Sequence, residues 1–355
     1  MDRYRVGIIA TGSIAASHAK GWRAIPDVDL VAIADSNEEA RREFGDRWEV
    51  DPDHRYADYR EMLDREKLDI VSICSWHPQH AEMTIAAAAR RPKVILCEKP
   101  MATSLGEADN MLIACQRNGV KLAIGHMRRF YSCWEEARRL VQAGAIGRPQ
   151  RVWSIVLEGL LNWGTHTIDG MRYVLGDPNA LWVMGAVERK TDRYERGMRI
   201  EDACMGLIQF EGGVQAVIEN DLTEKGSINF HIEGSDGILD VDENVVRLFN
   251  AETRGWQTLD NPQNDPFVGQ AQGIVDWLNG TVDEYRGEAR KGRETLEIML
   301  ALFESARLHE VTRLPLKTRQ SPLDLMVESG HLAPERPGRY DIRSFLVRGE
   351  EMVWH

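Results

Sequence analysis

The sequence is poor in cysteine, and its few thiols lie far apart. No two of them form a CxxC pair, and they occupy positions 74, 97, 115, 133 and 204 of the 355 residues. This spacing favours a reduced, cytoplasmic protein with buried thiols. No apolar run approaches the ~18 residues of a membrane-spanning helix, and a first strand near Tyr4 leaves no room for a signal peptide.

Positive charge is also scarce. Lysine and arginine together number 44 against 56 aspartates and glutamates, which gives a net charge of −12. A surface with this excess of negative charge disfavours nucleic acid or any other polyanion as a partner. We therefore expect a protein that binds neither nucleic acid nor a membrane.

The remaining composition is that of a globular protein, with 43% hydrophobic and 28% charged residues. A chain of this length exceeds the usual size of a single hydrophobic core, so we expect two domains.

The first third of the chain alternates apolar runs with helix-like segments. The expected strands are residues 5–10, 30–34, 70–74, 94–97 and 121–124, and the expected helices are 14–25, 37–48, 59–63, 80–90 and 104–118. Strands that alternate with helices at this spacing predict a parallel, doubly wound Rossmann sheet in an α/β domain over residues 1–125.

After residue 125 the pattern changes to long β-like segments. They cover residues 151–158, 180–190, 203–211, 214–222, 227–233, 237–241 and 244–249, and helices are expected at 133–142, 165–175, 267–279 and 294–310. Gly212-Gly213 is a hairpin signal. We expect an α+β domain over residues 126–316 with an open, largely antiparallel sheet, followed by an irregular tail at 317–355 with one helix near 322–329.

The turn at residues 10–15 reads ATGSIA, against the dinucleotide-binding fingerprint GxGxxG/A. Gly12 fits the position where the backbone approaches a pyrophosphate, and Ala15 is permitted at the third position, whereas Ala10 replaces the first glycine. Phosphate oxygens would meet free N–H groups at the start of the following helix. We therefore predict that Gly12, Ser13 and Ile14 contact a dinucleotide; the alternative is a plain surface turn.

Asp35 ends the second strand about 20 residues beyond this turn, where an acidic residue accepts the ribose hydroxyls of NAD. A carboxylate there would repel the 2′-phosphate of NADP, and no arginine follows directly. NAD is therefore the favoured cofactor.

The loop SWHPQH at residues 75–80 begins directly after the expected strand 70–74. Zinc would need further cysteine, histidine or carboxylate ligands nearby, and the sequence does not supply them at a recognisable spacing. We predict instead that Ser75, His77 and His80 contact the nicotinamide half of the cofactor, and we expect no metal.

The tripeptide Glu98-Lys99-Pro100 follows the buried strand 94–97. Ligands bind at the carboxyl ends of the strands in an open α/β sheet. Proline biases the residue before it toward an extended backbone, which restricts Lys99. We predict that Glu98 contacts the cofactor and that Lys99 has a functional role at this edge of the sheet, although most lysines are solvated surface charges.

Together these motifs resemble the Gfo/Idh/MocA oxidoreductases, which include glucose–fructose oxidoreductase and inositol dehydrogenase. The resemblance covers roughly residues 4–316, and it rests on VGIIATGSIA, Asp35, SWHPQH, CEKP and NWGTHTID at 162–169. It implies a Rossmann domain, a second open-sheet domain, tightly held NAD(P) and oxidation or reduction of a sugar or polyol. It also implies that Lys99 is a catalytic and substrate-binding residue.

The family's DxGxH motif maps onto Asn162 and His166, so the resemblance implies that His166 is catalytic. Asn162 can bind a hydroxyl but cannot accept a proton, which leaves proton transfer to His166 and Lys99. Asp169, one helical turn later, can orient His166 or stay solvated. Trp163 and Arg128 are further substrate-binding candidates; a core position and a solvated helix face are their respective alternatives.

We therefore expect an NAD-dependent dehydrogenase that transfers a hydride between nicotinamide and a carbinol of a sugar or polyol, assembled as a homodimer or homotetramer. Two alternatives remain open. One is an NAD-dependent glycosidase on the same fold, and the other is a non-catalytic sensor of NAD and sugar.

Overall fold

The computed structural model describes residues 3–222, 230–260 and 263–346, which fold into two compact units. The first unit runs up to Ala102 and includes Glu107–Phe130 and Asp265–Gly292. The second comprises Thr103–Gly106, Tyr131–Asn264 and the chain from Arg293 onward. Both units are therefore discontinuous in the sequence, unlike the continuous ranges that the sequence predicts.

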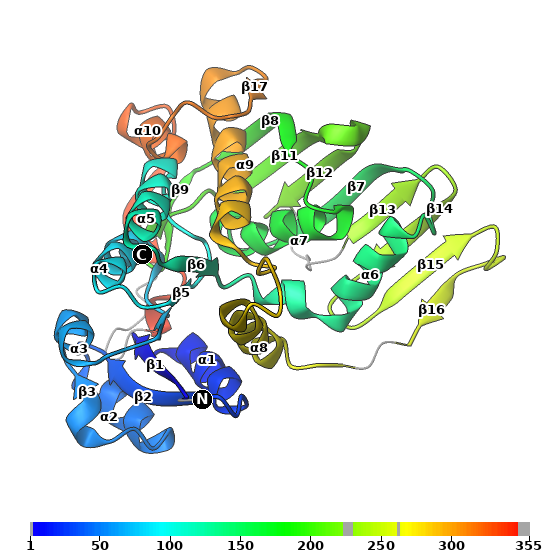
Figure 1. The fold of residues 1–355 in the computed structure, drawn as a ribbon. Coiled ribbons are helices and arrows are strands. Elements are labelled where there is room, and N and C mark those ends of the chain that lie inside the picture. The colour runs from blue at the N-terminus through cyan, green and yellow to red at the C-terminus, as the bar shows by residue number, and fades with distance from the viewer. Residues whose placement is uncertain (1–2, 223–229, 261–262, 347–355) are drawn as a thin grey trace. The chain divides into compact units, whose positions relative to one another are not determined.

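The first unit contains a six-stranded parallel sheet in the order β3-β2-β1-β4-β5-β6 (Figure 1). Its strands are β1 Tyr4–Ile9, β2 Val28–Ala34, β3 Arg55–Tyr56, β4 Ile70–Ile73, β5 Val94–Cys97 and β6 Lys121–Ile124. Its helices are α1 Ser13–Arg23, α2 Glu38–Arg47, α3 Tyr59–Arg65, α4 His80–Ala89 and α5 Leu105–Asn118, the last of which begins in the second unit. This strand order is that of the Rossmann fold and confirms the predicted doubly wound sheet.

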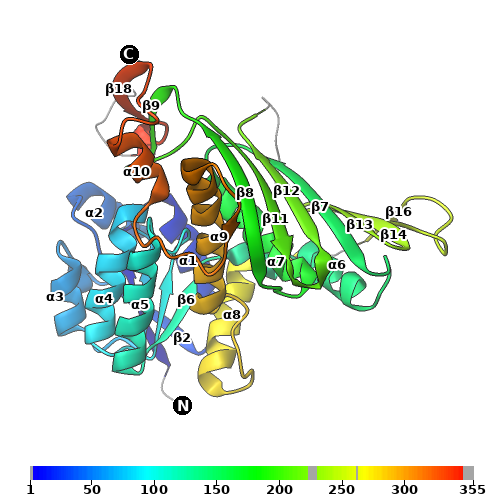
Figure 2. The same ribbon diagram turned by 90° about the horizontal axis from the view of Figure 1, so that it is seen from above.

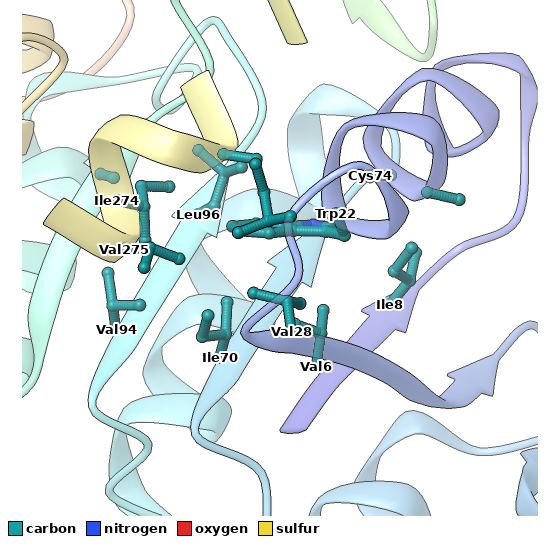
Figure 3. Packing of buried hydrophobic residues seen from close by; sticks show 14 of the residues in the cluster. Val6, Ile8, Trp22, Val28, Ile70, Cys74, Val94, Leu96, Ile274 and Val275 are labelled. Carbon is teal, nitrogen blue, oxygen red and sulfur yellow. The ribbon is translucent and has the colours of Figure 1, made fainter. Parts of the chain in front are cut away.

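Helix α8, Pro266–Asn279, completes the core of the first unit. It packs on α1 at close range, because a Cβ at Gly21 would lie 2.6 Å from the carbonyl oxygen of Phe267. Figure 3 shows Ile274 and Val275 of α8 beside Trp22 of α1, over the buried side chains of the sheet. The sequence pattern alone groups this helix with the second half of the chain.

The second unit contains a nine-stranded sheet in the order β16-β15-β14-β13-β7-β12-β11-β8-β17. Its strands are β7 Pro149–Val156, β8 Ala180–Glu188, β11 Ala203–Phe210, β12 Gln215–Asn220, β13 Phe230–Gly234, β14 Gly237–Val241, β15 Val246–Asn250, β16 Gln257–Leu259 and β17 Thr312–Arg313. β7 and β12 pair in parallel, and the other neighbours pair antiparallel. The predicted α+β class with a largely antiparallel sheet is confirmed.

The hairpin between β11 and β12 turns at Gly212 and Gly213, whose φ angles of 76° and 88° suit glycine. The strand expected at 227–233 starts within residues 223–229, which lie outside the described residues, and β13 begins at Phe230.

Three helices cover one face of the large sheet: α6 Ser132–Gln142, α7 Thr165–Leu175 and α9 Ala289–Leu308 (Figure 2). Leu302 of α9 lies against the sheet at Gly185 and Gly206, where a Cβ would clash with it. On the other face Met184, Met205 and Trp153 are exposed. One side of the sheet therefore belongs to the core, and the other presents apolar side chains to solvent.

A small second sheet joins the end of the chain to the second unit. It has the order β10-β9-β18, formed by β9 Thr191–Glu195, β10 Met198–Arg199 and β18 Arg336–Asp341. The predicted tail also contains α10, Pro322–Glu328, close to the expected helix. The tail is therefore more regular than its sequence suggests. None of the helices within the described ranges has the length and hydropathy needed to cross a membrane.

Candidate active site

The turn after β1 leads into α1 with an open N-terminus. Gly12 is the N-cap of α1 and has no capping side chain, and the first turn of the helix contains no acidic residue. A Cβ at Gly12 would meet no atom within 4 Å. Free N–H groups beside open space suit an anion, so this turn fits the pyrophosphate of a dinucleotide.

Ala10 occupies the position of the first glycine of the fingerprint. Its φ angle is 66°, in the left-handed region that glycine adopts without a steric penalty. The backbone at Ala10 therefore keeps a conformation that favours glycine, although the residue has changed.

Asp35 follows β2 and faces this turn. Its Oδ2 accepts hydrogen bonds from the N–H of Thr11 at 2.7 Å and from the Thr11 hydroxyl at 2.9 Å, and its Oδ1 accepts from the N–H of Asn37 at 2.9 Å. Arg41 on α2 donates to the backbone oxygen of Asp35 at 2.6 Å. The structure thus places a guanidinium, from a residue six positions later in the sequence, against the backbone of Asp35. Sequence reasoning considered only an arginine directly after Asp35 and missed Arg41.

His80 connects the loop after β4 to the loop after β5. Its Nδ1 lies 2.8 Å from the carbonyl oxygen of Pro100, and its Nε2 lies 3.0 Å from that of Ser75. Burial and the neighbouring His77 lower the pKa of His80 to about 4, and a neutral ring donates to only one of these two carbonyl oxygens. Ser75 and His77 are also buried, and the rings of His77 and His80 meet edge to face. The ring of His80 therefore lies between the loop after β4 and the loop after β5.

Glu98 is buried and forms an ion pair that sequence reasoning missed. Its Oε1 lies 2.8 Å from Nε2 of His18 on α1, and Nδ1 of His18 lies 2.7 Å from the hydroxyl of Ser72. Burial lowers the pKa of His18, but Cys74 and Glu98 outweigh it and raise that pKa to about 10. The signal was a histidine on the apolar face of a predicted helix, next to Ala15 and Ala19.

Lys99 is partly exposed, whereas Glu98 before it and Pro100 after it are buried. The peptide bond between Lys99 and Pro100 is cis. Burial raises the pKa of Glu98, but His18 and then Lys99 more than offset it, so that pKa is lowered. Lys99 therefore follows a buried carboxylate and presents its side chain at the carboxyl end of β5.

Arg128 lies in the 3-10 turn Met127–Phe130 and is buried. Its neighbour Arg129 donates to the backbone oxygen of Arg286 at 3.0 Å, within the first unit. The alternative for Arg128, a solvated helix face, does not hold, because Arg128 and its neighbour are both buried.

In the second unit a π-helix at Leu160–Gly164 runs directly into α7. Asn162 in the π-helix has no exposed surface, Trp163 is partly exposed, and His166 in α7 is 8% exposed. The amide of Asn162 donates to the carbonyl oxygen of Glu158 at 3.1 Å, and its oxygen accepts from Arg196 at 3.3 Å. Sequence reasoning missed Arg196, which comes from the turn between β9 and β10.

Asp169 lies on α7 one turn after His166 and is buried. Its Oδ1 accepts a hydrogen bond from the hydroxyl of Thr295 on α9 at 3.2 Å. Asp169 therefore helps to join α7 to α9, and of the alternatives left open for it the solvated carboxylate does not hold.

The predicted residues divide between the two units. The cofactor candidates, Lys99 and Arg128 belong to the first unit, whereas Asn162, Trp163 and His166 belong to the second. A Rossmann sheet with an open phosphate-binding turn and an acidic residue after β2 defines the class of dinucleotide-binding proteins.

Comparison with known proteins agrees with this class. Residues 4–126 match the profile of the oxidoreductase family with an NAD-binding Rossmann fold, and residues 156–240 match the GFO/IDH/MocA C-terminal domain. The chain belongs to the Gfo/Idh/MocA family of NAD-binding oxidoreductases.

Similar proteins include enzymes named for sugars. The chain is 27% identical to D-apiose dehydrogenase of Paraburkholderia graminis, over 93% of this chain and 95% of that protein. It is 31% identical to 1,5-anhydro-D-fructose reductase of Ensifer adhaerens, over 56% of this chain and 67% of that protein. The solved structure of levoglucosan dehydrogenase with NADH and levoglucosan has a similar fold, with a TM-score of 0.77, 21% identity and coverage of 89% of this chain and all of that chain.

Proposed function

We propose that this protein is an NAD-dependent dehydrogenase that acts on a CH–OH group of a sugar or polyol. The observation that carries the proposal is Lys99, a partly exposed ammonium at the carboxyl end of β5, next to the buried Glu98–His18 pair. The names of the relatives support the substrate class, because they refer to sugars and polyols.

NAD, when bound, supplies the hydride acceptor for this oxidation. Its phosphates would bind at Gly12, Ser13 and Ile14, and its ribose at Asp35. The loop Ser75–His80 would contact the nicotinamide half. Lys99 would polarise the hydroxyl oxygen of the substrate. His166 would take the hydroxyl proton at one of its ring nitrogens.

The other site residues act in binding under this proposal. Asn162 and Trp163 would contact the sugar, as would Arg128. Glu98 is better suited to a supporting role, because its carboxylate is buried against His18.

NAD should be preferred over NADP because of Asp35. Replacing Asp35 by alanine removes the negative charge and leaves Arg41 able to meet a 2′-phosphate, so the preference should narrow. In the double variant Asp35→Ala/Arg41→Ala, this gain in NADP affinity should disappear. A preference of the unmodified enzyme for NADP would contradict the assignment of Asp35.

We also propose a homo-oligomer located in the cytoplasm. The apolar open face of the large sheet, with Met184, Met205 and Trp153, would be covered by a second copy of this chain. All five cysteines are buried free thiols, which suits a reducing compartment.

The test is a panel of inositols, aldoses and glycosides, assayed by the absorbance of NADH. Lys99→Ala should lower kcat by orders of magnitude without changing the Kd for NAD, and His166→Ala should lower it by ~10²–10⁴. Lys93→Ala is a matched control, because Lys93 lies before the opposite end of β5 and pairs with Asp69.

Each of the other outcomes has a distinct meaning. Release of free sugar from a glycoside without net NADH would identify a glycosidase. Binding of NAD without turnover of any compound would identify a sensor. Normal turnover by His166→Ala would show that His166 is structural.

A further inference from the structure

The segment before the π-helix has an unusual backbone. Glu158 and Gly159 both have left-handed φ angles, of 65° and 88°. Their N–H groups and that of Leu160 follow one another directly, ahead of Asn162 and His166. Successive N–H groups in such a turn form a concave site that binds an anion.

In this protein the anions are two of its own carboxylates. Asp221, directly after β12, accepts from the N–H of Glu158 at 2.7 Å through Oδ1 and from that of Gly159 at 2.8 Å through Oδ2. Glu201, between β10 and β11, accepts from the N–H of Leu160 at 2.6 Å. All three N–H groups of the turn are thus bound by carboxylate oxygens.

The two carboxylates are themselves held in place. The amide of Asn220 donates to Glu201 Oε1 at 3.1 Å and to Asp221 Oδ2 at 3.0 Å. Arg193 on β9 donates to Asp221 Oδ2 at 3.4 Å and to the backbone oxygen of Glu201 at 3.3 Å. This network fixes the carboxylates before any substrate arrives.

Burial makes the arrangement costly, which argues for a role beyond filling the core. Glu201 and Asn220 have no exposed surface, and Glu201 Oε2 has no hydrogen-bond partner among the described residues. A buried carboxyl of this kind lowers the stability of the folded protein unless its hydrogen bonds to the turn offset the cost of its burial. Burial, together with the nearby Asp221, raises the pKa of Glu201 to about 7, against the effects of backbone N–H groups and Arg193.

We propose that Glu201 and Asp221 are positioning residues: they hold the turn at residues 158–160 and thereby set the orientation of Asn162 and His166 toward the substrate. This inference rests on the proposed function, because it assigns those two residues to the substrate site. The carboxylates touch the backbone of the turn and act through it.

The experiment compares Glu201→Ala with Glu201→Gln in the full-length enzyme. The alanine variant loses the acceptor for Leu160 and should lower kcat/KM for the sugar at least tenfold, with the Kd for NAD unchanged. The glutamine variant keeps an acceptor oxygen and should stay within about threefold of the unmodified enzyme. Asp221→Asn, which keeps one acceptor oxygen, should lower kcat/KM to an intermediate value.

Asp202→Ala is the matched control. Asp202 directly follows Glu201 in the sequence. Its carboxylate also accepts hydrogen bonds from backbone N–H groups, those of Lys190 at 2.5 Å and Thr191 at 2.7 Å. Its loss should lower the unfolding temperature without changing kcat/KM. Folded Glu201→Ala enzyme with unchanged kcat/KM would overturn the proposal, as would an equal loss in Asp202→Ala.

A second measurement does not need turnover. The side-chain NMR signal of His166, assigned with His166→Gln, should shift in Asp221→Asn, which loses one of the two acceptor oxygens, but not in Asp202→Ala. An unmoved signal would overturn the proposal even if Glu201→Ala fails to fold. If the signal shifts but no sugar or polyol is turned over, the positioning holds and the proposed function fails.

Discussion

At the scale of single residues, a substitution at Gly12 can test cofactor binding without disturbing the fold. A Cβ there meets no atom within 4 Å and the φ angle is −70°, so Gly12→Ala should fold with an unchanged unfolding temperature. The added methyl group would nevertheless occupy the space next to the helix N-terminus. We expect the Kd for NAD, measured by calorimetry, to rise at least tenfold. Unchanged NAD affinity would place the phosphates elsewhere.

Gly21→Ala provides the contrast on the same helix. Its Cβ would lie 2.6 Å from the carbonyl oxygen of Phe267, so this variant should lose stability because α1 and α8 must separate.

Glu201 gives the stability of the protein a dependence on pH. Its pKa is about 7 in the folded protein against the usual 4.5 of a glutamate, and the facing groups are Asp221, Arg193 and Cys204. The folded state therefore holds a proton that the unfolded state releases, and stability falls as the pH rises from about 4.5 to 7. The difference corresponds to about 3 kcal/mol.

The Glu201→Gln variant has no ionisable group at this position, so this source of pH dependence is absent. Urea unfolding at pH 5 and pH 7.5 should show a smaller loss of stability in the variant than in the unmodified protein. Parallel pH dependences of the two proteins would show that Glu201 is ionised in both states.

At the scale of elements, β18 fastens the turn between β9 and β10. Asp341 accepts from the N–H groups of Arg196 at 3.0 Å and Gly197 at 2.6 Å, both with left-handed φ angles. Asp341→Ala would leave these donors without the carboxylate and should lower the free energy of unfolding by about 1–3 kcal/mol. Asp341→Asn should recover part of the loss in urea unfolding. The exposed Arg336, on the same strand, gives a control variant, Arg336→Ala, that should be neutral.

The regular elements were predictable because each has its own local pattern. Apolar runs such as residues 94–97 and 121–124 form β5 and β6 with the expected bounds. The predicted hairpin at Gly212-Gly213 is confirmed. The turn needs positive φ angles, which glycine adopts without a steric penalty.

The remaining features depend on contacts between distant residues, which a local pattern does not contain. The π-helix at Leu160–Gly164 starts where Glu201 and Asp221 bind the N–H groups of Leu160 and Gly159, and β18 pairs with the distant β9. The site predictions at Lys99, Asn162 and His166 remain predictions. For Asn162 the structure adds Arg196, which would pair with an aspartate at that position and lower its basicity.

At the scale of the whole molecule, the open face of the large sheet bears on assembly. Met184 is 49% exposed and Met205 46%, on the neighbouring strands β8 and β11. Met184→Glu would place a charge on this face and should convert an oligomer into monomers in sedimentation experiments. Ile113→Glu on α5, where the side chain is 43% exposed, is the control that should leave the oligomer intact. A monomeric unmodified protein at micromolar concentration would contradict the expected homo-oligomer.

The return of Asp265–Gly292 to the first unit bears on how the chain matures during synthesis. The apolar side chains around Trp22 and Leu96 stay exposed to solvent on the nascent chain until α8 has left the ribosome, because Ile274 and Val275 of α8 bury them. By then residues 131–264, which include most strands of the other sheet, have already been translated. The unit that is begun first is thus closed late, and its incomplete core is open to aggregation while residues 98–279, about half of the chain, are translated.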